Sequence, residues 1–289
     1  MSTGWRTASS RRRPPHRWAG VAPHAHLQDL SGPGDRSVTT GGWSGGDRSG
    51  PTIGDVPSTA DYDEIADWYE HEFLARSGGS GGHPLGIDVA LIELLGPGVG
   101  PCLEIGCGTG AWAATVRGLG WTPIGMDLSV GMLGHARGRL PVAQADAVDL
   151  PVVSSAVASV ITVMAHTDMR CYPEVLREAS RVVRPGGVVV HVGVHPCFCG
   201  GFADRTDPAA VVIRPGYRDS DWTTESWTDR GLRDKVGAAH WPLPELVRAF
   251  LGAGLVIEGM FEGGEPTPTV LAIRGRKPPG TLGHTCSKE

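Results

Sequence analysis

Three carboxylates and one glycine-rich turn are the groups in this sequence whose types and spacing could do chemistry. Glu104 lies in the stretch CLEIGCGTGAW, where an apolar run breaks into glycines at positions 106, 108 and 110. Glycine lets backbone amides approach a ligand closely. Asp127 follows Gly106 by 21 residues, the place where an acid reaches ribose hydroxyls in a doubly wound fold, and Asp146 follows in QADAVDLP. We expect the three carboxylates to converge at the carboxyl ends of neighbouring strands.

Simpler interpretations of these groups stay open. The glycine turn alone is compatible with a tight bend that holds no ligand, and it also fits the relaxed dinucleotide pattern, with Ala111 in the last place. It is not a P-loop, because no Gly-Lys-Ser/Thr closes it. Each acid taken singly is compatible with a turn or a helix cap.

Alternating strands and helices must position these groups. The predicted strands are 101–105, 122–127, 141–146, 157–165 and 188–195, with helices over 110–120, 129–140 and 172–183. This alternation implies a parallel sheet with helices on both faces. Helices 61–76 and 87–96 precede it, and helix 242–254 is followed by strands 255–263 and 267–276, which we expect to form an antiparallel hairpin.

Composition divides the chain into a domain and two tails. Residues 1–57 are rich in Gly, Ser, Pro and Arg and lack apolar periodicity, so we predict a disordered tail there. Residues 58–277 form the predicted domain, and 278–289 a disordered C-terminal tail. Within the domain, residues 195–241 are irregular and rich in aromatic side chains, which indicates a lid insertion over the substrate.

The overall composition limits the function classes. The 289 residues carry a net charge of -5 and contain no run of about 18 apolar residues, so no membrane span is expected. The start shows no secretory signal, and the six cysteines show no CxxC pair, so we expect reduced thiols, no metal site and a cytoplasmic protein. The acidic folded part argues against a nucleic-acid partner. The oligomeric state stays open.

Several segments resemble the class I S-adenosylmethionine-dependent methyltransferases, most closely the small-molecule branch called methyltransferase type 11. They are LEIGCGTG, MDLSVGML, QADAVDLP, SRVVRPGG and the C-terminal hairpin, and the resemblance covers about residues 61–277. It implies a doubly wound, Rossmann-like α/β fold whose seven-stranded sheet has six parallel strands and an antiparallel last strand. It also implies S-adenosyl-L-methionine as cofactor and methyl transfer to an O, N or C atom of a small-molecule metabolite.

The resemblance implies cofactor-binding residues by position. Glu104 and the glycine turn would face the methionine part, Asp127 both ribose hydroxyls, and Asp146 the adenine amino group. Tyr62 or Tyr69 would close the pocket from the N-terminal helix. The whole implied set is Glu104, Gly106, Cys107, Gly108, Thr109, Gly110, Asp127, Leu128, Met132, Asp146, Ala147, Met164 and Ala165.

His166 and His195 are the candidate general bases, because His166 follows one predicted strand and His195 ends another at the expected methyl site. Packing or loop anchoring is the alternative for both. Methyl transfer from a sulfonium is an in-line displacement, and good alignment alone contributes roughly 7–11 kcal/mol, so no base is obligatory. Trp222, Trp227 and Trp241 are candidates for an apolar substrate wall, with an ordinary core role as the alternative.

Two other functions compete with methyl transfer. An NAD(P)-dependent reductase would use the same crevice, but its glycine turn stands near the start of its domain, whereas two predicted helices precede the turn here. A non-catalytic S-adenosylmethionine-binding protein would keep the fold without turnover, and the intact acids argue against it.

If the resemblance holds, Asp127→Ala weakens cofactor binding at least about tenfold, because a carboxylate that grips a ribose contributes roughly 1.5–3 kcal/mol. Isothermal titration calorimetry with S-adenosylhomocysteine measures this loss. An unchanged affinity would refute the assignment of Asp127.

Overall fold

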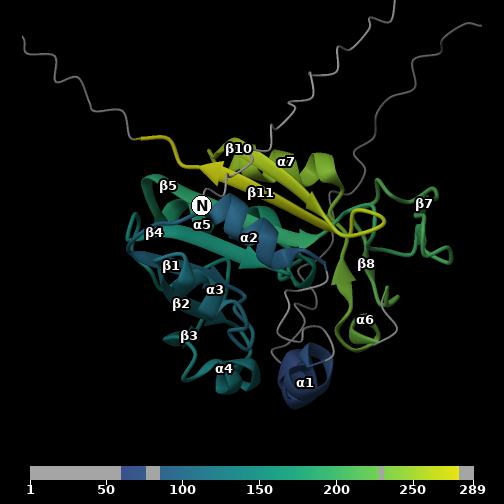
Figure 1. The fold of residues 1–289 in the computed structure, drawn as a ribbon, viewed down its shortest axis with the longest axis horizontal. Helices are drawn as coiled ribbons and strands as arrows, with labels where there is room; N and C mark the ends of the chain where they lie inside the picture. The colour runs from purple at the N-terminus through teal and green to yellow at the C-terminus, as the bar shows by residue number, and fades with distance from the viewer. Residues whose placement is uncertain (1–59, 76–84, 228–230, 280–289) are drawn as a thin grey trace, which may run out of the picture. The chain divides into compact units, whose positions relative to one another are not determined.

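A seven-stranded sheet forms the centre of the protein in a computed structural model that describes residues 60–75, 85–227 and 231–279 (Figure 1). The strand order is β10-β11-β5-β4-β1-β2-β3. The strands are β1 Pro101–Ile105, β2 Thr122–Asp127, β3 Val142–Gln144, β4 Val157–Val163, β5 Val183–Val194, β10 Val256–Gly263 and β11 Val270–Arg276. All neighbouring pairs from β3 to β5 are parallel, whereas β11 is antiparallel to both β5 and β10. Six strands therefore share one direction and the last strand in the chain opposes them, which confirms the predicted fold class.

Helices cover both faces of this sheet, as Figure 1 shows. They are α1 Ala60–Trp68, η1 Tyr69–Leu74, α2 Ile87–Leu95, α3 Ala113–Gly118, α4 Val130–Ala136, η2 His166–Asp168, α5 Tyr172–Val182, α6 Leu232–Val236 and α7 Leu243–Gly252. Alternate strand residues point to opposite faces. In β5, Val189 joins the core under α5 and α7, while Val190 joins the core under α2. Burial on both faces explains why β4 and β5 read as continuous apolar runs.

Several predicted boundaries are wrong: the helix expected over 129–140 ends at Ala136, and the strands expected to end at residues 146 and 165 end at Gln144 and Val163. Two further differences have backbone reasons. The helix expected over 61–76 changes at Tyr69 into the wider π-helix η1. The helix expected from Gly110 begins at Ala113, because Gly106, Gly108 and Gly110 all have positive φ, which an α-helix does not allow.

The segment predicted as a lid has little regular structure among its described residues. It contains short ladders between β6 Ala203–Asp204 and β7 Val212–Ile213, and between β8 Trp222–Thr223 and β9 Ala238–Ala239, besides α6. The predicted tails, 1–57 and 278–289, lie outside the described residues except for 278 and 279.

Within the described part of the chain, no helix combines the length and apolar character needed to cross a bilayer. The five cysteines in that part, 102, 107, 171, 197 and 199, are all free thiols.

Candidate functional site

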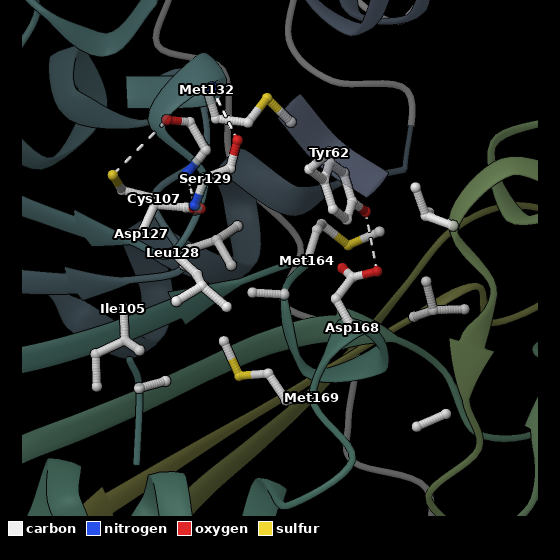
Figure 2. Close-up of a pocket in the computed structure, with 18 of the residues that line it drawn as sticks. Tyr62, Ile105, Cys107, Asp127, Leu128, Ser129, Met132, Met164, Asp168 and Met169 are labelled. Carbon is white, nitrogen blue, oxygen red and sulfur yellow. Dashed lines mark hydrogen bonds between the residues drawn. The ribbon is translucent and has the colours of Figure 1, made fainter. Parts of the chain in front are cut away.

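A cavity of about 1000 Å³ lies at the carboxyl ends of β1, β2 and β4. Figure 2 shows residues from these strand ends, from α1 and from the turn after β4 around it. In open α/β sheets, ligands bind in the crevice outside the carboxyl ends of the strands. Later parts of the chain also contribute to the lining, namely Phe198, Ser220, Asp221, Trp222, Trp227, Leu232, Arg233, Val236, Ala239, His240, Trp241 and Thr269. We call this space the strand-end cavity.

The glycine turn after β1 forms one edge of the strand-end cavity. A Cβ on Gly106 would lie 2.7 Å from the Cβ of Ala165, and one on Gly110 would lie 2.6 Å from Leu140 Cδ2. Both glycines also have positive φ, so larger residues would be strained as well as crowded. Residues 106–109 line the cavity, whereas Gly110 is outside the lining and shapes the turn.

Asp127 ties the end of β2 to this turn. Its Oδ2 accepts the backbone N–H of Gly108 at 2.8 Å, and its Oδ1 accepts that of Ser129 at 2.9 Å. Burial raises the pKa of Asp127, and these two hydrogen bonds lower it only in part. Each carboxylate oxygen has two lone pairs, so both can still accept a hydroxyl from a ligand.

Glu104 is the unusual group of the site. Its side chain is 1% exposed and lines the strand-end cavity, yet neither carboxyl oxygen has a hydrogen-bond partner among the described residues. Burial, with a smaller contribution from the charge of Asp127, raises its pKa from 4.5 to about 8. A buried carboxyl group without a partner needs a proton or a cationic ligand. The cavity beside it gives a cation access.

The remaining implied cofactor residues lie around the same cavity. Asp146 is exposed at its rim, where Oδ1 accepts the N–H of Val148 at 3.1 Å in a local turn. Leu128, Met132, Ala147, Met164 and Ala165 also line it. Met164 has a φ of 57°, which is uncommon for a residue with a side chain and marks the turn after β4 as strained.

A charged cluster closes the cavity between α1, η2 and α6. The Tyr62 hydroxyl donates to Asp168 Oδ1 at 2.9 Å, and the same oxygen pairs with the guanidinium of Arg233 (Figure 2 shows the first contact). Arg233 also donates to Thr167 Oγ1 at 2.9 Å and to the carbonyl of Gly237 at 3.0 Å. Burial would lower the pKa of Arg233, but the charge of Asp168 raises it overall. This cluster joins segments that the sequence alone did not connect.

The candidate bases lie elsewhere. Neither His166 nor His195 is among the described residues that line the strand-end cavity. His166 is buried with its ring 4.6 Å from that of His191, and burial holds its pKa well below the usual value. His195 accepts the N–H of Cys197 at Nδ1, and its Nε2 lies 2.9 Å from Glu262 Oε1. The strand β4 ends two residues and β5 one residue earlier than predicted, and the two rings pack between segments.

The segment predicted as a lid supplies much of the cavity wall. Trp222, Trp227 and Trp241 all line it. The guanidinium of Arg170 lies 3.8 Å from the ring centre of Trp222, and Arg233 lies 5.0 Å from that of Trp227. Sequence patterns had no means of identifying the two arginines, because a single arginine in an irregular segment carries no periodic signal.

Comparison with known proteins supports the interpretation of the strand ends. Residues 102–187 match the family model described as methyltransferase domain, a stretch that includes the glycine turn, Asp127 and Asp146. The chain is also 34% identical over 89 residues to the biotin biosynthesis bifunctional protein BioHC of Cellvibrio japonicus. That match covers 29% of this chain and only 18% of the relative.

Solved structures share the fold at low identity. An S-adenosylmethionine-dependent methyltransferase from Mesorhizobium loti superimposes with a TM-score of 0.54 and 19% identity, over 65% of this chain and 95% of that one. The [4+2]-cyclase SpnF superimposes with a TM-score of 0.53 and 16% identity, over 78% and 98%. These likenesses establish the fold, and the presence of a cyclase among them means that the fold alone does not assign the reaction.

Glu104 should make stability depend on pH in a defined window. Between about pH 4.5 and 8 the folded, ligand-free protein keeps the Glu104 proton that the unfolded chain releases, so the free energy of unfolding falls as pH rises. Glu104→Gln removes this dependence. We expect the variant to gain roughly 2–4 kcal/mol over wild type between pH 5 and 8.

Urea denaturation of both proteins at several pH values measures this difference. Glu93→Gln, on the exposed surface of α2, is the matched control. Its free energy of unfolding should change with pH in the same way as that of wild type. If the free energy of unfolding of Glu104→Gln also changes with pH as it does in wild type, Glu104 is not protonated in the folded state.

The charged cluster predicts a second stability difference. Asp168→Asn should lower the free energy of unfolding by about 3 kcal/mol, because it leaves the buried guanidinium of Arg233 without its anion. Tyr62→Phe should cost about 1 kcal/mol, since one hydrogen bond is lost. Asp204→Asn breaks an exposed pair with Arg214 in the same segment and should change little. Equal losses for Asp168→Asn and Asp204→Asn in chemical denaturation would contradict the assigned cluster.

Proposed function

We propose that this chain, a class I S-adenosylmethionine-dependent methyltransferase by its sheet topology and its methyltransferase domain, methylates an oxygen, nitrogen or carbon atom of a small molecule. The observation that carries the proposal is the buried, unpartnered carboxyl group of Glu104 facing the strand-end cavity beside the satisfied carboxylate of Asp127. S-Adenosylmethionine has an ammonium and a sulfonium and no phosphate. The described residues that line the cavity include several acids and no lysine, and of its two arginines Arg233 is paired with Asp168 while Arg170 lies over the Trp222 ring, so the lining fits those charges.

The residues present fit the cofactor group by group. In the proposed arrangement Glu104 pairs with the ammonium, the backbone of residues 106–109 surrounds the methionine part, and Asp127 accepts both ribose hydroxyls. Asp146 accepts the adenine amino group at the rim. Leu128, Met132, Ala147, Met164 and Ala165 supply apolar contacts, and Gly110 shapes the turn.

The cofactor supplies an electrophilic methyl group on a positively charged sulfur, and the protein supplies position. Ligand sites for drug-sized molecules span about 300–1,000 Å³, so a cavity of about 1000 Å³ accommodates the cofactor together with an acceptor. The wall formed by Trp222, Trp227 and Trp241 favours an acceptor with a flat, apolar body. Holding that body in line with the methyl group contributes roughly 7–11 kcal/mol.

No imidazole base is needed in this proposal. His166 and His195 lie outside the cavity lining, and the depressed pKa of His166 keeps its ring neutral. His240 does line the cavity, but its Nε2 lies 2.8 Å from the carbonyl oxygen of Tyr217 and its Nδ1 3.5 Å from Cys199 Sγ, so both ring nitrogens already have partners. The role of His166 and His195 as general bases stays a prediction of the sequence, and alignment of an already nucleophilic acceptor is the mechanism that the described lining supports.

The proposed domain spans residues 58–277, with 195–241 as a lid over the acceptor. Two contacts support the lid: Arg233 of α6 pairs with Asp168 next to the fourth strand, and His195 pairs with Glu262 of β10. The segment is thus attached to β10 near its start and to η2 near its end, and Trp222 and Trp227, which lie between these contacts, line the cavity.

Binding and product formation test the proposed function. The full chain should bind S-adenosylhomocysteine but not NADH in isothermal titration, and metabolite extracts incubated with the chain and S-adenosylmethionine should contain a species heavier by one methyl. His195→Ala should keep kcat within about threefold, because alignment rather than an imidazole base carries the barrier reduction. NADH binding without S-adenosylhomocysteine binding would favour a reductase. Cofactor binding without any methylated product would favour a non-catalytic binding protein.

A further inference from the structure

Three side chains that commonly bind metals meet where the N-terminal helix packs on α4, outside the residues that line the strand-end cavity. Asp67 lies in α1, His71 in η1 and His135 in α4. One ligand atom from each lies within 4.8 Å of the other two. His135 Nε2 is 2.9 Å from Asp67 Oδ1, and the two imidazole rings are 5.5 Å apart and nearly perpendicular.

We propose that Asp67, His71 and His135 bind one divalent transition-metal ion, with Zn²⁺ as the type case. Two imidazoles and one carboxylate form a donor set that suits zinc and its neighbours in the first transition row. Mg²⁺ and Ca²⁺ prefer oxygen ligands throughout, so they fit less well. Three protein ligands leave the fourth tetrahedral position to water. Asp67 and His71 are exposed, which gives an ion direct access.

The two helices that carry the ligands are held at a fixed distance. A Cβ on Gly131 would lie 3.1 Å from both Asp63 Cα and Ala66 Cβ, so the helices touch through a glycine. The Asp63 carboxylate accepts the N–H of Gly131 at 2.8 Å and the hydroxyl of Ser129. One helical turn further along each helix, Asp67 meets His135. One ion with metal–ligand distances of about 2.0–2.2 Å would draw together three ligand atoms that already lie within 4.8 Å of one another.

The packing of α1 on α4 explains the positions of two of the three side chains, Asp67 and His135. Asp63 with Ser129, Asp67 with His135 and Glu70 with Arg139 form a ladder of polar contacts between the helices. The Asp67–His135 contact is one rung of that ladder. His71 is not part of it, and its ring lies edge-on to that of His135. A metal ion accounts for the position of His71, and this residue distinguishes the two interpretations.

Metal binding would act on the cavity through α1. Tyr62 and Tyr69 belong to the same helical segment and line the strand-end cavity, and Asp63 holds Ser129 beside Asp127. An ion that bridges α1 and α4 stabilises the docked helix and therefore the cavity wall. Because the cofactor binds against that wall, Zn²⁺ should tighten cofactor binding, and the cofactor should tighten Zn²⁺ binding by the same factor. This coupling rests on the proposed function, whereas the metal site does not.

Zinc titration of the full, metal-free chain tests the site directly. A chromophoric chelator as competitor reports both affinity and stoichiometry. Because the chain has 11 histidines, the test compares variants rather than wild type alone. Wild type should bind one more Zn²⁺ per chain than His71→Ala, or bind the ion at least about tenfold more tightly. A loss of about tenfold in metal affinity is seen even when only a partner outside the direct ligands is removed. Glu64→Ala, at an exposed position of α1, is the matched control and should match wild type.

We expect His71→Ala to fold like wild type, because His71 is exposed and its removal leaves the polar contacts between α1 and α4 intact. Zn²⁺ should also raise the Tm of wild type and of Glu64→Ala, but not that of His71→Ala. Identical zinc binding and Tm shifts in wild type and His71→Ala would overturn the metal site. Zinc binding that leaves S-adenosylhomocysteine affinity unchanged would overturn the coupling alone, and loss of S-adenosylhomocysteine binding in every variant would count against the proposed function instead.

Discussion

The structure around the strand-end cavity depends on the burial of a carboxyl group without a donor. Glu104 is removed from water at the end of β1, and the turn beside it consists mainly of glycines, which offer no side-chain donor. Such a group lowers its free energy by keeping a proton or by pairing with a cation. Asp127, one strand away, has a different environment, because two backbone N–H groups already satisfy it. One acid therefore attracts charge while the other is oriented to accept hydrogen bonds.

The walls of the cavity lie outside the parallel sheet and are attached to it by polar contacts. Asp168 joins Tyr62 of α1 to Arg233 of α6, and Asp63 joins α1 to the start of α4. Buried charged contacts of this kind contribute little net stability but are costly to break singly. They set the position of otherwise irregular segments. The acceptor side of the cavity therefore depends on a few residues, whereas the cofactor side depends on the sheet.

The two candidate histidines show that the position of a residue in the chain does not determine where its side chain points. His166 and His195 do follow the strands expected to end at the site. Their rings nevertheless turn into contacts with His191 and with Glu262. His166 begins η2 and His195 lies just beyond β5, so the turn after each strand, and not the alternation within it, sets the direction of the side chain. Chemistry by alignment is consistent with a site in which the imidazoles of His166 and His195 serve packing.

The sequence by itself determined the order of strands and helices along the chain, the antiparallel hairpin at its end, and the positions of the three acids near strand ends beside the glycine turn. Each of these has a local cause: apolar residues repeat with the period of a helix or a strand, and glycine permits positive φ. Tertiary structure alone decided that Arg233 meets Asp168, that Asp67 and His71 meet His135, and that Glu104 has no donor among the described residues. These partners are separated by tens of residues, and packing of whole elements brings them together. A local sequence pattern does not predict which distant side chain, if any, will lie beside a buried charge.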